Sequence, residues 1–328
     1  MSEYDAFFAN ATNTAKEGAT SLKKTYWLLD EDNVAPEPNQ AKFGMAAASE
    51  LTEVLEKAKR DLGVTETLFN TDIVTFNNTP VRYYIDDTIM AFTWKQVFDY
   101  CVYTISEVKI MHPSQIRRYF AGGDYNYGGR YRTTDLAASA NAVVASSGDF
   151  CKFRGLGIVV YNGKLHRMEG RYLDTCFIDD KGDLLFARQN ELTDRETTEK
   201  YIEDNNIRHS ITFGPVLVKD SEISLPGGYW LGEIYDNYPR AAIAQMGELH
   251  YLLITANAEG GNWLVPTIFS FANRVQSFGC KQAYTMDGGQ TAVIAMNDEL
   301  INRVLYGWQR FVSDIVYFAT AVPEAAQK

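Results

Sequence analysis

The sequence has no long apolar run and an excess of negative charge. No stretch of 18 apolar residues occurs in the 328-residue chain, which excludes a membrane-spanning helix. The start, MSEYDAFFANATNTAKEG, has neither a basic segment nor an apolar one, so we expect no signal peptide in it. The 31 Lys and Arg residues against 42 Asp and Glu residues give a formal net charge of −11. This balance argues against non-specific binding to nucleic acids or to anionic membranes.

The sequence also lacks the common short motifs of catalysis and metal binding. No G-x-S-x-G, P-loop or G-x-G-x-x-G pattern occurs, which argues against an α/β-hydrolase, an NTPase and a dinucleotide enzyme. Neither a C-x-x-C pair nor an H-E-x-x-H motif is found, so we predict no metal site. The four widely spaced cysteines are predicted to be buried thiols, with a disulfide left open: Cys101, Cys151, Cys176 and Cys280.

The strongest local signals that are present are those of strands joined by tight turns. Asn162-Gly163 is a favoured two-residue turn and predicts a hairpin over 156–167. Lys181-Gly182 predicts a second hairpin over 174–187. Alternating and apolar runs predict further strands over 101–110, 209–223 and 240–256.

Helical patterns are fewer. The spacing of Leu51, Val54, Leu55 and Ala58 predicts a helix over 49–63, with Ser49 as its N-cap and Gly63 at its end. Residues 132–150 read as a helix that leads into a buried strand. A third helix is predicted over 266–279, with Pro266 at its first position and Gly279 ending it.

These elements indicate an α+β protein with strand-rich mixed sheets and flanking helices. Residues 1–97 are interpreted as a partly helical N-terminal appendage, with a linker over 30–44. The main domain is predicted to span 98–322, followed by a tail at 323–328.

Two turns of small residues follow apolar strands and place a carboxylate beside glycine. One is ASSGDF, with Ser147, Gly148 and Asp149; the other is MDGGQT, with Asp287, Gly288, Gly289, Gln290 and Thr291. Glycine lets consecutive backbone N–H groups approach a ligand oxygen. The alternative is a tight turn in which the aspartate caps its own backbone. A third glycine turn, TFGPV, contains Gly214.

Several charged or titratable residues interrupt apolar strands. Arg240 opens the run RAAIAQ and either pairs with an acid for structural reasons or grips a carboxylate or phosphate. Glu107 lies in a similar position within ISEVKI. His209 precedes the Gly214 turn and is a candidate proton carrier or hydrogen-bond donor. Arg310 and Asp314 are expected to form a salt bridge with each other.

The order of these segments is more specific than any one of them. NAVVASSGDF, GIVVYNGKLHR, TFGPVLVKD, PRAAIAQMGELHYLLITAN and GCKQAYTMDGGQTAVIAMNDELINRV together resemble the phosphodiester glycosidase family over about residues 100–322. The family's asparagine-glycine-glycine turn is here Ser147-Gly148-Asp149, and Gln290 replaces its third glycine. At the end of the following strand, Asn257 replaces an aspartate-glycine-arginine sequence of the family. In its DGGQ and GD turns the chain resembles a bacterial subgroup.

The resemblance implies a hydrolase that cleaves the sugar C1–O bond of a sugar-1-phosphodiester in a glycoconjugate or cell-surface polysaccharide. Asp287 or Asp149 would act as base or nucleophile, and Arg240 with the N–H groups of the glycine turn would bind the phosphate. The remaining substrate-binding candidates are Ser147, Gly148, Gly214, Thr291, Asn257, Glu107 and His209. No cofactor is required; a divalent cation is possible but not compelled. The resemblance also implies an extracellular or cell-surface location.

Two other functions stay open. The high aromatic content, with 20 tyrosines, suits a non-catalytic polysaccharide-binding protein on the same fold, although tyrosine-rich β proteins reach it without a ligand. A phosphodiesterase that cuts the P–O bond instead of the C–O bond is the third possibility.

Overall fold

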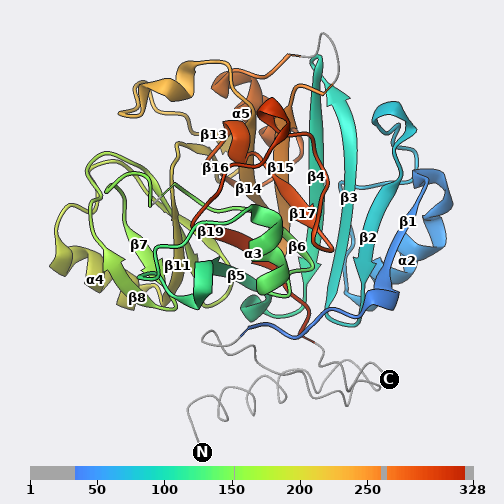
Figure 1. The fold of residues 1–328 in the computed structure, drawn as a ribbon, viewed down its shortest axis with the longest axis horizontal. Helices are drawn as coiled ribbons and strands as arrows, with labels where there is room; N and C mark the ends of the chain where they lie inside the picture. Colours follow the sequence, from blue (N-terminus) through green and yellow to red (C-terminus); the bar gives the residue numbers. More distant parts are fainter. Residues whose placement is uncertain (1–33, 151, 260–263, 322–328) are drawn as a thin grey trace, which may run out of the picture.

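A nine-stranded sheet forms the centre of the computed structural model, which describes residues 34–150, 152–259 and 264–321 (Figure 1). Every strand pair within these ranges is antiparallel. In order across the sheet, its strands are β1 (Phe43–Ala46), β2 (Val81–Ile85), β3 (Ile89–Phe98), β4 (Cys101–Ile110), β15 (His250–Asn257), β14 (Arg240–Gly247), β16 (Gln282–Met286), β12 (Val216–Lys219) and β13 (Glu222–Ile223).

Smaller sheets pack against one face of this central sheet. The five-stranded sheet is β18 (Glu299–Leu300), β17 (Ile294–Met296), β6 (Val144–Ser147), β19 (Asp314–Phe318) and β5 (Ile116–Phe120). The three-stranded sheet is β10 (Leu184–Ala187), β9 (Thr175–Asp179) and β11 (Ile207–Thr212), and a hairpin is formed by β7 (Val159–Tyr161) and β8 (Lys164–Arg167). One apolar core joins the layers, because Ile243 and Leu253 of the central sheet pack with Val144, Val316 and Ile211.

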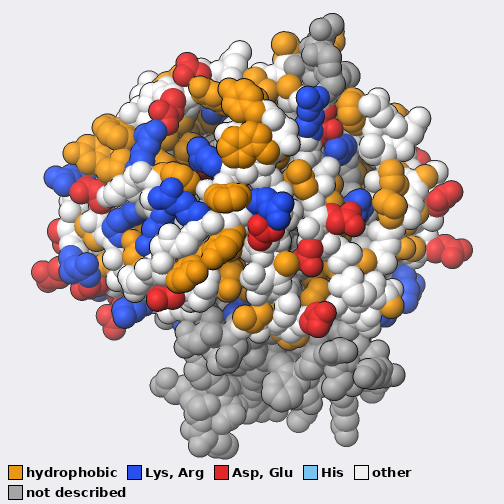
Figure 2. Space-filling model, viewed as in Figure 1, with side chains coloured by type: hydrophobic (Ala, Val, Ile, Leu, Met, Phe, Trp, Pro, Cys, Tyr) orange, Lys and Arg blue, Asp and Glu red, His pale blue; other side chains and the backbone are white. Residues whose placement is uncertain are grey.

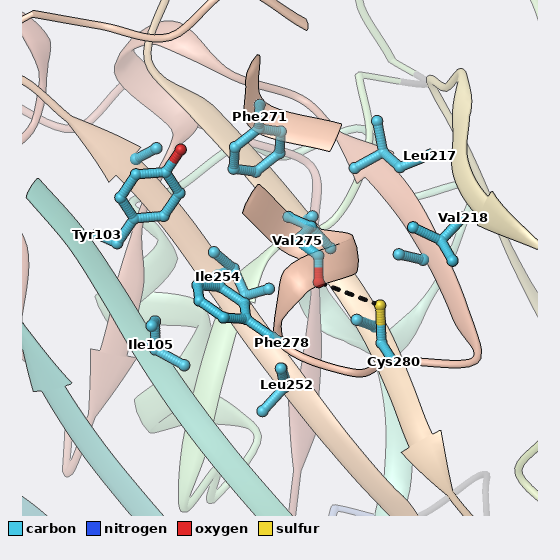
Figure 3. Close-up of a cluster of buried hydrophobic side chains, with 14 of the residues drawn as sticks. Tyr103, Ile105, Leu217, Val218, Leu252, Ile254, Phe271, Val275, Phe278 and Cys280 are labelled. Carbon is cyan, nitrogen blue, oxygen red and sulfur yellow. Dashed lines mark hydrogen bonds between the residues drawn. The ribbon is translucent and has the colours of Figure 1, made fainter. Parts of the chain in front are cut away.

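Helices cover the outer faces. α2 (Thr52–Asp61) and α5 (Ile268–Ser277) lie on the other face of the central sheet, α3 (Thr133–Ser139) covers the five-stranded sheet, and α4 (Arg195–Asp204) packs near the three-stranded one. Figure 3 shows Phe271 and Val275 of α5 packed over Leu252 and Ile254 of β15. Each side chain of this size contributes about 1.5–3 kcal/mol when it is fully buried. The Cys280 thiol closes the cluster by donating to the Val275 carbonyl oxygen at 3.4 Å.

The predicted α+β class is confirmed, as are the main elements along the chain; the antiparallel pairing differs from the mixed sheets expected. Asn162 and Gly163 both have positive φ and form the turn between β7 and β8. Two helix starts were predicted wrongly. Leu51 rather than Ser49 is the N-cap of α2, because Ala48–Glu50 form a separate 3-10 turn. Thr267 rather than Pro266 precedes the first turn of α5, and its hydroxyl accepts from the Ser270 N–H.

The predicted boundary after residue 97 does not coincide with a break in the structure. It falls at the end of β3, which pairs along its length with β4. β1 and β2 extend the same sheet, and Leu55 and Ala58 of α2 share its core. Two predicted segments lie outside the described residues. They are residues 1–33 of the appendage, which include the start assessed for a signal peptide, and the tail at 323–328.

Three cysteines are buried free thiols, as predicted: Cys101, Cys176 and Cys280. Burial raises the pKa of the Cys101 and Cys280 thiols to about 12. Cys151 lies outside the described residues. Within the described ranges, every helix is too short or too polar to traverse a lipid bilayer.

Candidate functional site

Arg240 and Asp287 lie next to each other at matching ends of two paired strands. Arg240 is the first residue of β14, and Asp287 directly follows β16. The register pairs Ala241 with Met286, so Arg240 and Asp287 occupy the next position along the ladder. Both side chains line a cavity of about 440 Å³, here called the site cavity. Two sequence segments 47 residues apart thus bring a guanidinium and a carboxylate into one hollow.

Arg240 enters the site cavity as a cation held by neutral groups. Its Nη2 donates to the Ile234 carbonyl oxygen at 2.7 Å and also to the Asp236 carbonyl oxygen. Its buried Nε has no hydrogen-bond partner, and no carboxylate of the described residues forms a salt bridge with it. Burial lowers the pKa of Arg240 to about 10, which still leaves it charged near neutral pH. An anion in the cavity would therefore complete its coordination.

Asp287 is buried and forms an ion pair with Arg310. Burial raises the pKa of the Asp287 carboxyl above its usual value, and the Arg310 cation opposes that shift. Arg310 also lies over the ring of Phe153, 4.8 Å from its centroid, and its Nε has no hydrogen-bond partner. The predicted salt bridge between Arg310 and Asp314 is wrong, because Asp314 pairs with Arg118 instead.

The glycine turn after Asp287 is held against the backbone of Pro239. A Cβ on Gly288 would lie 2.4 Å from the Pro239 carbonyl oxygen, so only glycine fits there. Gly289 has a φ of +63° and donates its N–H to the same oxygen at 2.9 Å. The N–H groups of this turn were predicted to bind the phosphate, but the Gly289 N–H is occupied by the Pro239 carbonyl oxygen. Gln290 lines the cavity with a buried Nε2 that has no partner.

Ser147, Gly148, Asp149 and Thr291 form a buried layer adjoining this turn. The Ser147 hydroxyl donates to the Thr291 carbonyl oxygen, and the Thr291 hydroxyl donates to the Gly288 carbonyl oxygen at 2.6 Å. A Cβ on Gly148 would lie 2.0 Å from Asp314 Oδ2, so this glycine is required by close packing. Through these contacts, the five-stranded sheet holds the glycine turn that follows Asp287 in place.

The Asp149 carboxylate is committed to a buried ion cluster. Its Oδ2 accepts from Arg118 Nη2 at 2.8 Å and from the Thr212 N–H at 3.0 Å. Arg118 Nη2 also lies 2.9 Å from Asp314 Oδ2, and all three side chains are fully buried. Asp149 does not line the site cavity, although the next residue, Phe150, does. Arg118 was not predicted from the sequence, where its signal is a pair of arginines inside the strand IRRYF.

Four further predicted residues do not line the site cavity. Gly214 packs with its Cα against Tyr229, whereas its neighbour Phe213 is in the wall. Asn257 accepts at Oδ1 from Asn302 Nδ2 at 3.1 Å. Glu107 accepts from the N–H groups of Leu68 and Phe69 and contacts His250 Nε2 at 2.8 Å.

His209, the last of these four, is buried among cations. Burial and the neighbouring charges of Arg117 and Arg118 hold its pKa well below the usual value. It is therefore neutral near pH 7, away from the cavity wall.

Much of the cavity wall was also not predicted from the sequence. The additional side chains are mostly aromatic or form a second ion pair, between Arg154 and Glu233; they include Phe150, Phe153, Phe213, Tyr238 and Tyr306. On the face in Figure 2, Lys and Arg side chains gather left of centre among hydrophobic ones, despite the acidic composition of the chain. Among the residues the structure describes, no group of three or more His, Cys, Asp or Glu side chains could hold a metal ion.

Comparisons with known proteins agree with this architecture. The solved catalytic domain of zebrafish N-acetylglucosamine-1-phosphodiester alpha-N-acetylglucosaminidase, auto-inhibited by its pro-peptide, is similar with a TM-score of 0.56 and 16% identity, over 71% of this chain and 83% of that one. A hypothetical protein from Synechocystis has a TM-score of 0.57 and 14% identity, over 76% of this chain and 64% of that one. At these identities the likeness establishes the fold.

Comparisons of sequence identify one relative and the family of this chain. The SPbeta prophage-derived uncharacterized protein YomE of Bacillus subtilis (strain 168) is 28% identical over 120 residues, which are 37% of this chain. The match spans about a fifth, 19%, of that relative's length. Residues 140–319 match the model of the phosphodiester glycosidase family, and this range includes Arg240 and Asp287 with the paired strands β14 and β16. Because the match covers more than half of the chain, the protein belongs to the phosphodiester glycosidase family, a family of hydrolases.

Proposed function

We propose that this protein hydrolyses the bond between C1 of a sugar and the bridging oxygen of a phosphodiester. The substrate would be a sugar-1-phosphodiester of the N-acetylglucosamine type within a glycoconjugate or a cell-surface polysaccharide. The observation that carries the proposal is the buried Arg240 guanidinium, whose Nε lacks a partner in the same cavity as Asp287. Such a substrate supports placing the protein outside the cell or at its surface.

The chemistry needs one carboxylate and one anion-binding group. Water adds to C1 while the C1–O bond breaks, and the aglycone leaves as a phosphate monoester. That leaving group is already an anion of low basicity, so it needs little general-acid help. Arg240 would stabilise the negative charge that grows on the phosphate oxygens. Asp287 would act as base or nucleophile at C1.

Two carboxylates were candidates for that second role, and the contacts favour Asp287. Asp149 is fully buried, and its carboxylate already accepts from Arg118 and from the Thr212 N–H. Asp287 lines the cavity and contacts Arg310, which is itself partly exposed. A carboxylate must reach the substrate to act as nucleophile or base.

The test is release of reducing sugar from a synthetic sugar-1-phosphodiester. We expect Asp287→Asn and Arg240→Ala each to reduce turnover by at least about a hundredfold, in the range found when a transition-state contact is removed. Circular dichroism and thermal unfolding should show that both variants are folded. Arg171→Ala is the matched control, because Arg171 is exposed, pairs with Glu169 and lies outside the cavity wall. Full turnover by a folded Asp287→Asn protein would refute the assignment.

Isotope labelling decides which bond is cut. In water enriched with oxygen-18, cleavage at C1–O places the label in the sugar, whereas cleavage at P–O places it in the phosphate. Label in the phosphate would support a phosphodiesterase instead. Tight binding of the substrate by the wild-type protein without any release would support the non-catalytic polysaccharide-binding alternative.

A further inference from the structure

Tyr306 is displayed at the rim of the site cavity in an unusual backbone conformation. It lies in the 3-10 turn Leu305–Gly307, its φ is +60°, and 78% of its surface is exposed. Tyr306 and Leu305 both line the site cavity. A positive φ in a bulky residue costs about 1–3 kcal/mol and persists only where the surrounding structure imposes it. Since an exposed tyrosine gains little from burial, its stability contribution does not explain this placement.

The turn that carries Tyr306 is tied to the Asp287 turn. It packs against the 3-10 turn Gly289–Thr291. The Arg310 N–H donates to the Gln290 carbonyl oxygen at 3.5 Å, and the Arg310 side chain reaches Asp287. The Gly307 N–H closes the turn on the Val304 carbonyl oxygen at 3.1 Å. The Tyr306 ring therefore stands on the same wall as the proposed catalytic carboxylate.

An aromatic ring in the same cavity as that carboxylate has a clear complement in carbohydrate chemistry. One face of a pyranose ring carries axial C–H bonds and is apolar, and aromatic side chains offer a flat apolar face with a polar tip. Phe153 and Tyr238, which are 38% and 45% exposed, line the same cavity and enlarge this apolar area. The cationic groups there suit the phosphate, so the aromatic wall is left for the sugar.

We propose that Tyr306 is the stacking platform of a sugar-binding subsite, and that its ligand is the pyranose ring attached through C1 to the phosphate. This inference rests on the proposed function for the identity of the ligand. The Gly307 hydrogen bond to Val304 and the contact with Gly289–Thr291 hold the backbone that carries the ring at the cavity rim.

The chain supplies a matched control for this tyrosine. Tyr100, in the turn between β3 and β4, has a φ of +59° and is 74% exposed. It does not line the site cavity. Replacing either tyrosine by glycine removes an exposed ring and relieves the same backbone strain, so the two variants differ chiefly in their distance from the cavity.

The experiment measures binding rather than turnover, by titration calorimetry on the full chain with two probes, N-acetylglucosamine and inorganic phosphate. We expect Tyr306→Gly to raise the Kd for the sugar about tenfold, the upper range for an aromatic contact. Tyr306→Phe should keep the Kd within about twofold, because the stacking face remains. Tyr100→Gly should leave it unchanged, and no variant should alter the Kd for phosphate.

Three results would overturn the subsite. The first is an unchanged sugar Kd in Tyr306→Gly. The second is an equal loss of sugar and phosphate binding in that variant, which would mean that the cavity wall has collapsed. The third is a wild-type protein that does not bind the sugar. Failure of the proposed function looks different: the sugar would bind and depend on Tyr306, while the phosphodiester would not be hydrolysed.

Discussion

Arg310 pairs with Asp287, although Asp314 is closer in the sequence. Asp314 begins β19 and turns into the molecule, where it meets Arg118. Arg310 lies before that strand and faces the site cavity. Arg310 thus pairs with Asp287 at the cavity wall, whereas Arg118 pairs with Asp314 in the core.

The ion pair between Arg310 and Asp287 predicts a pH effect. Burial raises the pKa of Asp287 and Arg310 lowers it, so Arg310→Gln should raise it further. If Asp287 acts as the ionised base or nucleophile, activity is lost as the pH falls through this pKa. We therefore expect the acidic limb of the pH–rate profile to move to higher pH, so that kcat/KM falls more at acidic than at alkaline pH.

A profile that keeps its acidic limb in Arg310→Gln would show that the limb belongs to another group. Lys200→Gln is a suitable control, because Lys200 pairs with Asp204 on the exposed face of α4. Its profile should overlay that of the wild type.

The charges that line the site cavity predict selectivity between anions. The cavity wall contains three guanidiniums and two carboxylates, those of Arg154, Arg240, Arg310, Asp287 and Glu233. Together they leave one positive charge in excess, which matches the single negative charge of a phosphodiester. The product, a phosphate monoester, carries nearly two negative charges. Glu233→Gln should therefore lower the inhibition constant of glycerol 2-phosphate by up to about fivefold, the limit for a partly exposed charge pair.

The comparison with a singly charged anion makes this prediction specific. Dimethyl phosphate should gain less affinity than glycerol 2-phosphate in Glu233→Gln, and both gains should shrink at high salt. Glu169→Gln removes a carboxylate outside the cavity and should change neither constant. Equal gains for the two anions would contradict selection by charge.

The buried cluster of Arg118, Asp149 and Asp314 predicts how stability depends on pH. Burial and the nearby Asp149 carboxylate raise the pKa of Asp314 from 3.8 to about 6, against the opposing effect of Arg118. Between about pH 4 and 6 the folded state then binds more protons than the unfolded state, so the free energy of unfolding falls as the pH rises. Asp314→Asn should remove this fall.

Urea unfolding at pH 4.5 and pH 7 measures the effect. Relative to the wild type, Asp314→Asn should gain about 2 kcal/mol on going from the lower to the higher pH. Asp204→Asn, at an exposed pair on α4, should follow the wild-type curve. Parallel curves for Asp314→Asn and the wild type would contradict the raised pKa.

Local sequence signals predicted the elements whose geometry depends on near neighbours. The turn Asn162-Gly163 requires positive φ at both positions, which these residue types tolerate. The strand predicted over 101–110 is β4, with the same bounds. Arg240 and Asp287 were identified from their positions at strand ends beside small residues, and they meet at one cavity.

Contacts between distant segments could not be predicted in this way. Arg118 meets Asp149 across 31 residues and Asp314 across 196, and no local pattern encodes those distances. The sequence of residues 1–97 was interpreted as a separate appendage. In the structure, β1, β2 and β3 pair in series with β4 and so belong to the central sheet. The Gly289 amide was predicted to bind the phosphate because the sequence cannot show that the Pro239 carbonyl oxygen accepts its N–H.

The pairing of β4 with β15 has a consequence for synthesis of the chain. About 140 residues separate the end of β4 from its partner strand, so β4 leaves the ribosome long before β15 exists. At 5–20 residues per second, the wait is roughly 7–28 s. During that interval the β2–β3–β4 meander presents an open hydrogen-bonding edge, which can recruit another nascent chain. Productive folding of this protein therefore depends on protecting one strand edge until the last third of the polypeptide emerges.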